Sequence, residues 1–425
     1  MPDRDNNRPG SANEVLEQHE HAKGLYSNAV SRMKEVDELL TGVYEVPKDV
    51  RDMKGTTVAQ PVLPRAIIER VRQMMAVQTA TARVIPSKPG EKERNNATKK
   101  ERWLNGALRR TRYESKRDPH RDAIYWYLLR GRVDYEVRVL PNFAGSGKFP
   151  IQTLTDDPMT IFPVRGRNGI LWYTKEYTIY ARELKHDLRD KEENAGFLDG
   201  MDANDEIPIV EYWDDTYYAA VAKTESKKGE PDGHLLMSKK HEYGFVPLAE
   251  ARCMDTPLAS AEWAGQSVIG PVVNHIKQVY ILASKMATGV NLFYYPLLYG
   301  VSPNGQPVII DPNNPGEVQP LAVGTKLEVI PVQVNSSVLQ QLMGFFKSEI
   351  NLMTLPETAF GAEPTNLESG FAISQVMNAV ASAVSDKLPQ MELAMGDLYG
   401  FWLRLYRDFG AGTGMDFAVP LDMER

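Results

Sequence analysis

The chain has 425 residues, of which 42% are hydrophobic and 25% are charged, as is ordinary for a folded protein of roughly two or three domains. Its formal net charge of −7 argues against a simple cationic nucleic-acid binder. The single cysteine, Cys253, excludes an internal disulfide framework and a cysteine-based zinc site, and it fits a reducing compartment. No stretch reaches the roughly 18 apolar residues of a membrane span and no apolar signal core begins the chain, so we expect assembly in a cytosol.

The N-terminal part of the chain has helical patterns. Residues 1–44 are expected to form a flexible and helical segment, with a helix over residues 15–40. Pro64 is expected to open another helix, because its fixed backbone angle suits a first helical turn. The candidate buried positions of these two helices are Leu16, Leu25, Val30, Met33, Val36, Ile67, Ile68, Val71, Met74 and Met75.

Two further helices are predicted after a solvated loop over residues 87–97. The first is centred on Trp103. The second has clear end signals, with Asp118 as its N-cap, Pro119 at its first position and Gly131 just past its end.

The middle of the chain is predicted to be rich in β-strands. Residues 133–140 alternate between polar and apolar side chains, and several similar runs follow in residues 151–252. Asp214 and Asp215 lie between two such runs and predict a hairpin turn. Residues 223–233 are expected to be an exposed loop.

The last third has a distinctive order of elements. Residues 257–289 are predicted to be helical, residues 290–334 are dense in turn residues with short β-runs between them, and residues 336–353 are helical again. After a loop comes a long helical pattern over residues 367–409, which Pro389 must kink or interrupt. This order predicts an elongated, assembling subunit rather than a compact enzyme.

The candidate chemical sites are incomplete. Residues 144–149 (AGSGKF) are similar to a phosphate-binding loop, but Asn142 stands where the first glycine belongs and Phe149 replaces the magnesium-binding Ser or Thr, so a β-turn is favoured. His19 and His21 are two positions apart, so on a helix their rings do not converge on a metal, and an exposed helix is favoured.

Three charged groups leave alternatives open. Asp214 and Asp215 with Glu211 are either a carboxylate cluster for a metal or for acid–base chemistry, or the favoured hairpin turn. Lys277 and Lys285 share a helix face, as a phosphate-facing stripe or as two exposed lysines. A basic block in residues 99–138 is either a site for nucleic acid or an acidic partner, or the favoured solvated helix face; it includes Arg109, Arg110, Arg112, Lys116, Arg117 and Arg121.

Several stretches resemble segments of the portal proteins of tailed bacteriophages. Residues 241–248 (HEYGFVPL) look like the strand segment before the first stem helix, and residues 265–271 (GQSVIGP) look like that helix's beginning. Residues 355–370 look like the tunnel loop that leads into the long helix. The likeness covers residues 45–410 and depends on element order and weak local patterns rather than on an invariant motif.

The resemblance implies an α+β fold with a mixed α/β wing, a two-helix stem, a small β-containing clip and a long kinked helix. Carried onto this chain, its parts are an N-terminal segment (1–44), wing (45–256), first stem helix (257–289), clip (290–335), second stem helix (336–353), tunnel loop (354–369), long kinked helix (370–410) and a short tail (411–425) with the family's crown minimal or missing.

The resemblance also implies roles for individual residues, and it implies no catalytic, cofactor or metal site. The expected tunnel-loop residues facing DNA are Glu357, Glu363, Asn366 and Glu368; the lumen-facing cations are Lys277, Lys285 and Lys347; the clip residues are Asn304, Asp311, Asn313 and Asn314; and the helix kink is at Pro389.

The function implied is that of a ring-shaped homo-oligomer, normally a dodecamer, at one capsid vertex of the virion, through which double-stranded DNA is packaged and ejected. The expected partners are further copies, DNA, the large terminase subunit, a head–tail adaptor and the major capsid and scaffolding proteins, without a membrane. One alternative is another structural virion protein, such as a head–tail adaptor or minor capsid protein, which would lack the helix–β–helix insert. A nucleic-acid enzyme would need a complete nucleotide loop or a metal-binding carboxylate set.

Overall fold

The computed structural model describes residues 9–41, 58–59, 62–76, 81–115, 118–140, 149–188, 196–198, 201–225, 231–254, 265–294, 298–301, 324, 326–329, 336–355, 378, 382 and 384–410. The protein is mixed α+β, and the strand pairings among these residues are antiparallel. The chain divides into two compact units, one made of residues 1–34, 71–268 and 381–425 and the other of residues 35–70 and 269–380.

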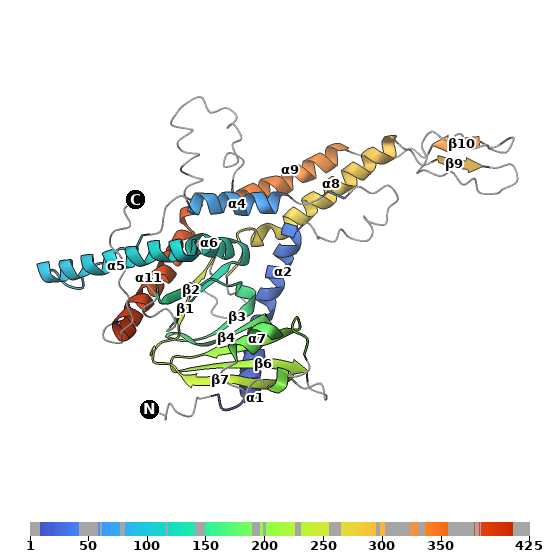
Figure 1. Ribbon diagram of the computed structural model, residues 1–425. Helices are drawn as coiled ribbons and strands as arrows, with labels where there is room; N and C mark the ends of the chain where they lie inside the picture. Colours follow the sequence, from blue (N-terminus) through green and yellow to red (C-terminus); the bar gives the residue numbers. More distant parts are fainter. Residues whose placement is uncertain are drawn as a thin grey trace. The chain divides into compact units, whose positions relative to one another are not determined.

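The first unit contains a five-stranded sheet in which each strand pairs with the next along the chain (Figure 1). The strands are β3 (Ile161–Gly166), β4 (Gly169–Tyr180), β5 (Glu206–Trp213), β6 (Tyr217–Glu225) and β7 (Pro231–Lys240). Asp214 Oδ1 accepts hydrogen bonds from the N–H groups of Thr216 and Tyr217 between β5 and β6. The predicted hairpin turn is therefore confirmed, whereas much of the predicted loop over residues 223–233 belongs to β6 and β7.

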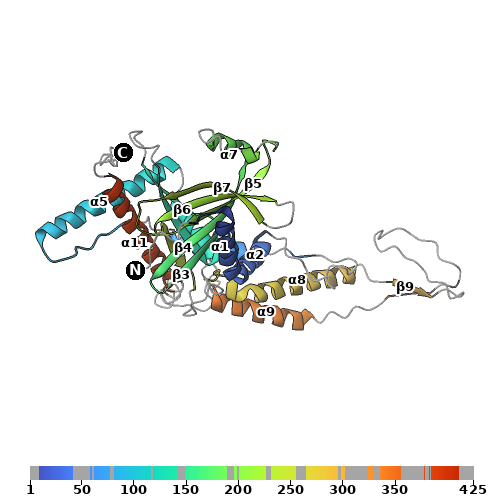
Figure 2. The ribbon, with the colours of Figure 1, turned by 90° about the horizontal axis from the view of Figure 1, so that it is seen from below.

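Helices lie on both faces of this sheet (Figure 2). Val15 of α1 (Ala12–Leu25) packs against Val210 on one face. Leu184 of α7 (Ala181–Asp187), together with η5 (Gly196–Leu198), packs against Ile209 on the other face. Successive residues of a strand point to opposite faces, so the apolar run of β5 has to be covered on both sides.

The N-terminal helix is interrupted at Tyr26, so the single helix predicted over residues 15–40 was wrong. α1 ends at Leu25 and α2 runs over Ser27–Thr41. Tyr26 is buried and its hydroxyl donates to the Pro163 carbonyl of β3 at 2.8 Å. This anchoring favours a break, and it leaves Leu25 39% exposed rather than buried as predicted.

A three-stranded sheet, in the order β2–β1–β8, forms the rest of the strand structure of the first unit. Its strands are β2 (Ile151–Leu154), β1 (Arg132–Val139) and β8 (Leu248–Arg252). One face is apolar and contacts α6 (Pro119–Arg130) and α11 (Leu388–Leu405). The apolar side chains alternate along the strands and include Val133, Tyr135, Val137, Ala249 and Ala251.

The ends of α6 follow the prediction. The Asp118 side chain accepts a hydrogen bond from the His120 N–H at 3.1 Å, Pro119 lies in the first turn, and Gly131 ends the helix in a left-handed conformation. A Cβ atom at Gly131 would lie 2.3 Å from the Gln266 backbone. Both its backbone angle and this close approach therefore require glycine.

Helix α5 (Glu91–Ser115) begins earlier than expected, because residues 91–97 are helical rather than a loop. Glu91 and Glu93 lie in its first turn, where negative charge is favoured by the helix dipole. Asn105 holds the preceding extended segment by accepting from the Ala82 N–H at 2.8 Å and donating to the Ala82 carbonyl at 3.0 Å.

The second unit contains α8 (Val273–Tyr294), the strands β9 (Leu298–Val301) and β10 (Lys326–Val329), and α9 (Ser336–Met353). A 3₁₀ turn, η7 (Gly270–Val272), precedes α8. The predicted helix opened by Pro64 is α4 (Leu63–Met75). The Tyr280 hydroxyl of α8 accepts from the Val62 and Leu63 N–H groups at 2.9 and 3.0 Å, which satisfies donors at the start of α4.

Candidate functional site

The helix–β–helix order predicted in the last third is present in the second unit. α8 and α9 lie side by side, and the antiparallel β9–β10 pair follows α8 (Figure 1). α9 has the predicted bounds. The helix predicted over residues 257–289 differs at both ends, because residues 265–269 are not helical, α8 begins only at Val273 after the turn η7, and it continues through Gly289 to Tyr294. The ring of His275 in α8 meets that of Phe346 in α9 edge to face, with centroids 5.8 Å apart.

α9 has two apolar faces, of which one is exposed. Its less exposed side chains recur at helical spacing: Leu339, Met343, Phe346 and Ile350. A second series, called here the α9 apolar stripe, consists of Val338 (46% exposed), Leu342 (43%), Phe345 (57%) and Leu352 (78%). Glu349 lies on the same face between Phe345 and Leu352, so the uninterrupted part of the stripe is Val338, Leu342 and Phe345. An exposed apolar row of this kind on a regular helix is typical of a protein interface.

The three predicted lumen cations have different surroundings. Lys277 is mostly buried and forms an ion pair with Glu35. Lys285 in α8 and Lys347 in α9 are exposed. Lys277 and Lys285 therefore do not form the stripe of two equivalent lysines considered from the sequence.

Most of the predicted loop residues lie outside the described residues. These are the tunnel-loop residues Glu357, Glu363, Asn366 and Glu368, the clip residues Asn304, Asp311, Asn313 and Asn314, and the tail over residues 411–425. The glycine-rich segment over residues 144–148, with Lys116 and Arg117 of the basic block, also lies outside them.

Pro389 begins a helix instead of kinking one. Residues 386 and 387 form a turn, and Pro389 lies in the first turn of α11, where its missing N–H removes no helical hydrogen bond. α11 leads into a π-helical turn, η9 (Tyr406–Gly410). The sequence predicted that Pro389 would either kink or interrupt the helical pattern over residues 367–409, and the structure has an interruption at this point.

Residues 241–247, expected to be a strand segment, are irregular, and the strand β8 begins at Leu248. Gly244 has a left-handed backbone (φ 66°), which breaks strand geometry. The segment packs through aromatic side chains: the Tyr243 hydroxyl accepts from the Val139 N–H at 3.0 Å, and Phe245 stacks on Phe401 with centroids 4.5 Å apart.

His19, which was expected on an exposed helix, is fully buried against the five-stranded sheet. Its Nδ1 lies 3.0 Å from Thr174 Oγ1 and its Nε2 lies 3.3 Å from Glu176 Oε2. Glu176 also accepts from Lys23 at 2.7 Å and Lys223 at 2.9 Å. The hydrogen bond from His19 and those from the two lysines outweigh partial burial and hold the pKa of Glu176 far below its usual value.

A largely buried ionic layer, with Arg165 and Asp156 at its exposed edge, lies on the second face of the three-stranded sheet, and the sequence reasoning missed it. Its residues are Arg132, Asp134, Glu136 and Arg138 of β1, Glu250 and Arg252 of β8, Arg165 of β3, Lys175 of β4, Glu211 of β5, and Asp156. These side chains join the two sheets. Five cations oppose five carboxylates, so the layer is formally neutral.

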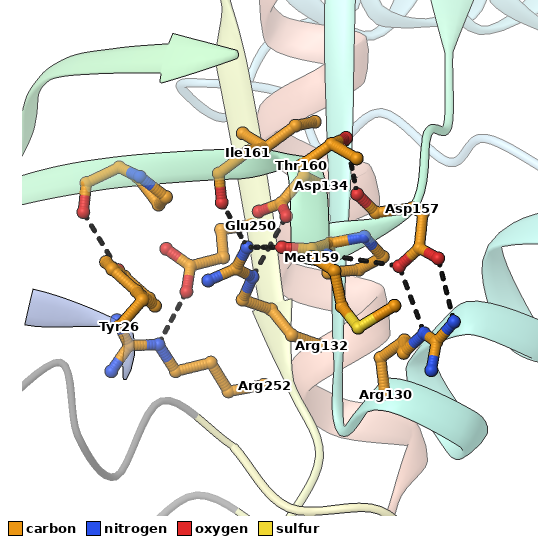
Figure 3. Close-up of polar contacts among 12 residues, drawn as sticks. Tyr26, Arg130, Arg132, Asp134, Asp157, Met159, Thr160, Ile161, Glu250 and Arg252 are labelled. Carbon is orange, nitrogen blue, oxygen red and sulfur yellow. Dashed lines mark hydrogen bonds and ion pairs between the residues drawn. The ribbon is translucent and has the colours of Figure 1, made fainter. Parts of the chain in front are cut away.

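The first half of the layer surrounds Arg132 (Figure 3). Arg132 is fully buried, donates to Asp134 at 2.9 Å and to the carbonyls of Pro158 and Ile161 at 2.6 Å, and lies over the Tyr26 ring. The 3₁₀ turn η3 (Pro158–Thr160) is thereby tied to β1. Beside it, Arg130 makes a two-pronged contact with Asp157 at 3.0 and 2.8 Å.

The second half is centred on Glu211. Its carboxylate accepts from Arg138, from the hydroxyls of Tyr177 and Tyr218 at 3.0 and 3.1 Å, and from the Trp213 indole at 3.4 Å. Burial opposes its charge, but Arg138 and Lys175 hold the pKa of Glu211 below its usual value. The suggested cluster of Glu211 with Asp214 and Asp215 therefore separates into a buried ion-pair partner and a turn.

Asp134 differs from the other carboxylates of the layer. Burial raises its pKa to about 7, even though Arg132 favours the charged form. For Glu250, burial is outweighed by Arg252, Arg165 and Arg132, which hold its pKa below the usual value. The layer is accordingly a structural joint whose groups bond mostly to one another, although Arg132 Nη1 and Asp134 Oδ1 have no hydrogen-bond partner among the residues that the structure describes.

The β1 sequence, RVDYEVRV, contains the signal for this layer. Arg132, Asp134, Glu136 and Arg138 occupy alternate positions, so they share one face of the strand. Alternating charge is usually taken as a solvent-facing strand, and only the second sheet that covers it makes the layer buried.

A small cavity lies at the start of α6. It is lined by His120, Tyr135, Thr153 and Trp402 among others, and the Tyr135 hydroxyl and His120 Nδ1 have no hydrogen-bond partner within the described part of the chain. Burial lowers the pKa of His120. The cavity volume of about 20 Å³ is the room of a single water molecule, too small for an organic cofactor.

The residues that the structure describes contain no group of three or more His, Cys, Asp or Glu side chains placed to hold a metal. Among those same residues, no helix combines the length and apolar character needed to cross a bilayer. No protein-family model and no curated protein sequence matches the chain.

Proposed function

We propose that the chain is a portal protein, a ring-forming subunit through which double-stranded DNA enters and leaves a tailed-phage capsid. The observation that carries the proposal is the helix–β–helix unit of α8, β9–β10 and α9. It has the order of stem helix, clip and stem helix that the resemblance implies. Another structural virion protein, the main alternative, would lack this insert.

Self-assembly is supported by the α9 apolar stripe. Four apolar side chains, each at least 43% exposed, lie on one helix face. Covering such a row removes apolar surface from water, which favours association. In the proposed ring, stem helices of neighbouring copies cover it.

The proposal assigns transport rather than catalysis to the chain. Twelve copies at −7 each would carry 12 × −7 = −84, which opposes adsorption of DNA to the ring as a whole. Lys285 and Lys347, which are exposed, would soften this barrier locally if they face the lumen. The large terminase subunit would supply the energy for packaging, and the clip would dock it and later the head–tail adaptor.

The test is negative-stain electron microscopy of the purified chain. A twelvefold or thirteenfold ring with a central hole is expected. A protein that stays monomeric at high concentration would contradict the proposal, and a closed assembly without a central hole would favour the alternative structural role.

A further inference from the structure

Helix α5 has a row of positive charge along its exposed side. Lys92, Lys99, Arg102 and Arg109 recur at helical spacing and are exposed. Together they are called here the α5 basic stripe. Asn95, Gly106 and Tyr113 occupy the positions between and beyond them on the same face, so no acidic side chain interrupts the stripe.

The acidic side chains of α5 mostly bond to neighbouring parts of the protein. Glu101 accepts from the Val84 N–H at 3.2 Å, and Glu93 accepts from the Ser87 hydroxyl at 3.4 Å. Glu114 accepts from the Phe149 N–H at 3.1 Å and from Arg110 at 2.6 Å. Only Glu91, at the first position, remains, so the helix does not neutralise its own stripe.

The four cations have no hydrogen bond or ion pair with any residue that the structure describes. The opposite side of α5 is fixed by buried Ala97, Leu104 and Ala107. In both views the N-terminal half of the helix extends away from the sheets of its unit (Figures 1 and 2). The charges are therefore held on a regular element and are accessible in the single chain.

We infer that the α5 basic stripe binds the phosphate backbone of double-stranded DNA that is not threaded through a channel. The stripe spans 17 residue steps, or about 25 Å at 1.5 Å per residue, which is long enough to follow several phosphates of one strand. The choice of DNA rests on the proposed function, which places the chain beside packaged DNA.

The composition of the stripe favours a polyanion over an acidic protein. Protein interfaces depend on buried aromatic and aliphatic anchors, whereas this stripe has only Tyr113, at one end. Contacts of lysine and arginine with phosphates position a duplex but carry no information about its base sequence. Binding is therefore independent of sequence and strongly dependent on salt.

The test uses the full chain and a covalently closed duplex minicircle, which cannot thread a preformed ring and so reports on the outer surface. The affinity for the minicircle is measured at several salt concentrations between 50 and 200 mM, for the natural chain and for two variants, because binding to phosphates weakens as the salt concentration rises. The stripe variant is Lys92→Gln, Lys99→Gln, Arg102→Gln and Arg109→Gln. The control variant changes four other exposed cations: Lys34→Gln, Arg167→Gln, Lys185→Gln and Lys240→Gln.

We expect the natural chain and the control to bind the minicircle with affinities within about threefold of each other. The stripe variant should bind the minicircle more than about tenfold more weakly than the natural chain. The slope of log affinity against log salt concentration should become less steep by about 3 to 4, at roughly 0.9 per lost phosphate contact. Equal losses in both variants, no binding by the natural chain, or displacement by polyglutamate at equal charge as readily as by DNA would overturn the inference.

Ring formation, followed separately by electron microscopy, distinguishes this inference from the proposed function. Rings that do not bind the minicircle contradict the inference alone. Stripe-dependent binding by a chain that forms no ring contradicts the proposed function alone.

Discussion

At the scale of single residues, Glu176 shows how one carboxylate can fix the position of a helix. It accepts from His19 and Lys23 of α1 and from Lys223 of β6, so it ties α1 to the five-stranded sheet. The helix also packs closely at Gly233, where a Cβ atom would lie 2.7 Å from the Val221 side chain and 2.9 Å from the end of the Leu16 side chain, so these side chains would have to shift. The hydrogen bonds of Glu176 and the close packing at Gly233 therefore favour the same position of α1 on the five-stranded sheet.

The substitution Glu176→Gln should lower the free energy of unfolding at pH 7 by about 1 to 3 kcal/mol, because it weakens three hydrogen bonds between charged or polar groups. The folded-state pKa of Glu176 lies below its ordinary value of 4.5. Its stabilisation is therefore complete above pH 4.5 and is lost as the pH falls further. Urea unfolding at several pH values measures this.

The matched control is Glu183→Gln, which changes an exposed carboxylate of α7. The free energy of unfolding of this control should lie within about 0.5 kcal/mol of that of the natural chain. A Glu176→Gln deficit that stays constant from pH 7 to pH 3 would contradict the assigned role of the charge.

At the scale of elements, end signals and periodicity were enough to predict some segments. Asp118, Pro119 and Gly131 set the limits of α6 through local geometry, and α9 follows from apolar spacing. The break at Tyr26 was not predicted in this way, and the contact that favours it is a hydrogen bond to Pro163, far along the chain. End signals and apolar periodicity carry no information about contacts between residues that are far apart in sequence.

The same limit applies to the candidate site. The order of α8, β9–β10 and α9 was predicted, since turn-rich and helical compositions differ clearly. Burial of the charges on β1 was not, because it depends on β3, β4 and β5 supplying Arg165, Lys175 and Glu211. The ion pair of Lys277 with Glu35 likewise joins residues far apart in sequence.

The α9 apolar stripe gives a prediction for assembly. Changing Leu342→Gln and Phe345→Gln together should weaken self-association by at least about tenfold, which corresponds to a loss of about 1.4 kcal/mol of apolar burial. Sedimentation velocity over a range of concentrations measures the effect. Since both side chains are exposed in the single chain, the stability of the monomer should barely change.

A control for this variant changes polar positions of the same helix, Gln340→Ala with Ser348→Ala, both exposed. Association should be preserved in the control. If the two variants associate equally well, the stripe is not part of the interface.

At the scale of the whole molecule, the proposed function divides the chain by task. One unit holds two sheets joined through ion pairs, and the other holds the paired helices and the β9–β10 strands. Assembly would depend on apolar contacts, whereas passage of DNA would depend on charge. Variants should therefore separate the two properties.

The predicted tunnel loop tests this separation. Shortening residues 354–369, or combining Glu357→Gln, Glu363→Gln and Glu368→Gln, should reduce DNA packaging or retention while rings still form. The DNA content of filled heads and electron microscopy of the rings are the two measurements. Normal packaging by these variants would count strongly against the assignment.

The control for the loop variant neutralises three exposed carboxylates elsewhere, Glu183→Gln, Glu206→Gln and Glu242→Gln. It matches the change in net charge. Packaging should be unaffected in the control, since the proposed effect depends on where the charge lies along the DNA path.

The ionic layer has a consequence for how this chain can vary among its relatives. Removing one member leaves an opposite charge buried without its partner, at a cost of about 3 to 5 kcal/mol, whereas replacing both members of a pair by apolar residues is often neutral. Positions such as 138 and 211, or 252 and 250, should therefore change together or not at all. Paired substitution at these sites would be a signature by which diverged homologues could be aligned even after their surface sequences have lost all likeness.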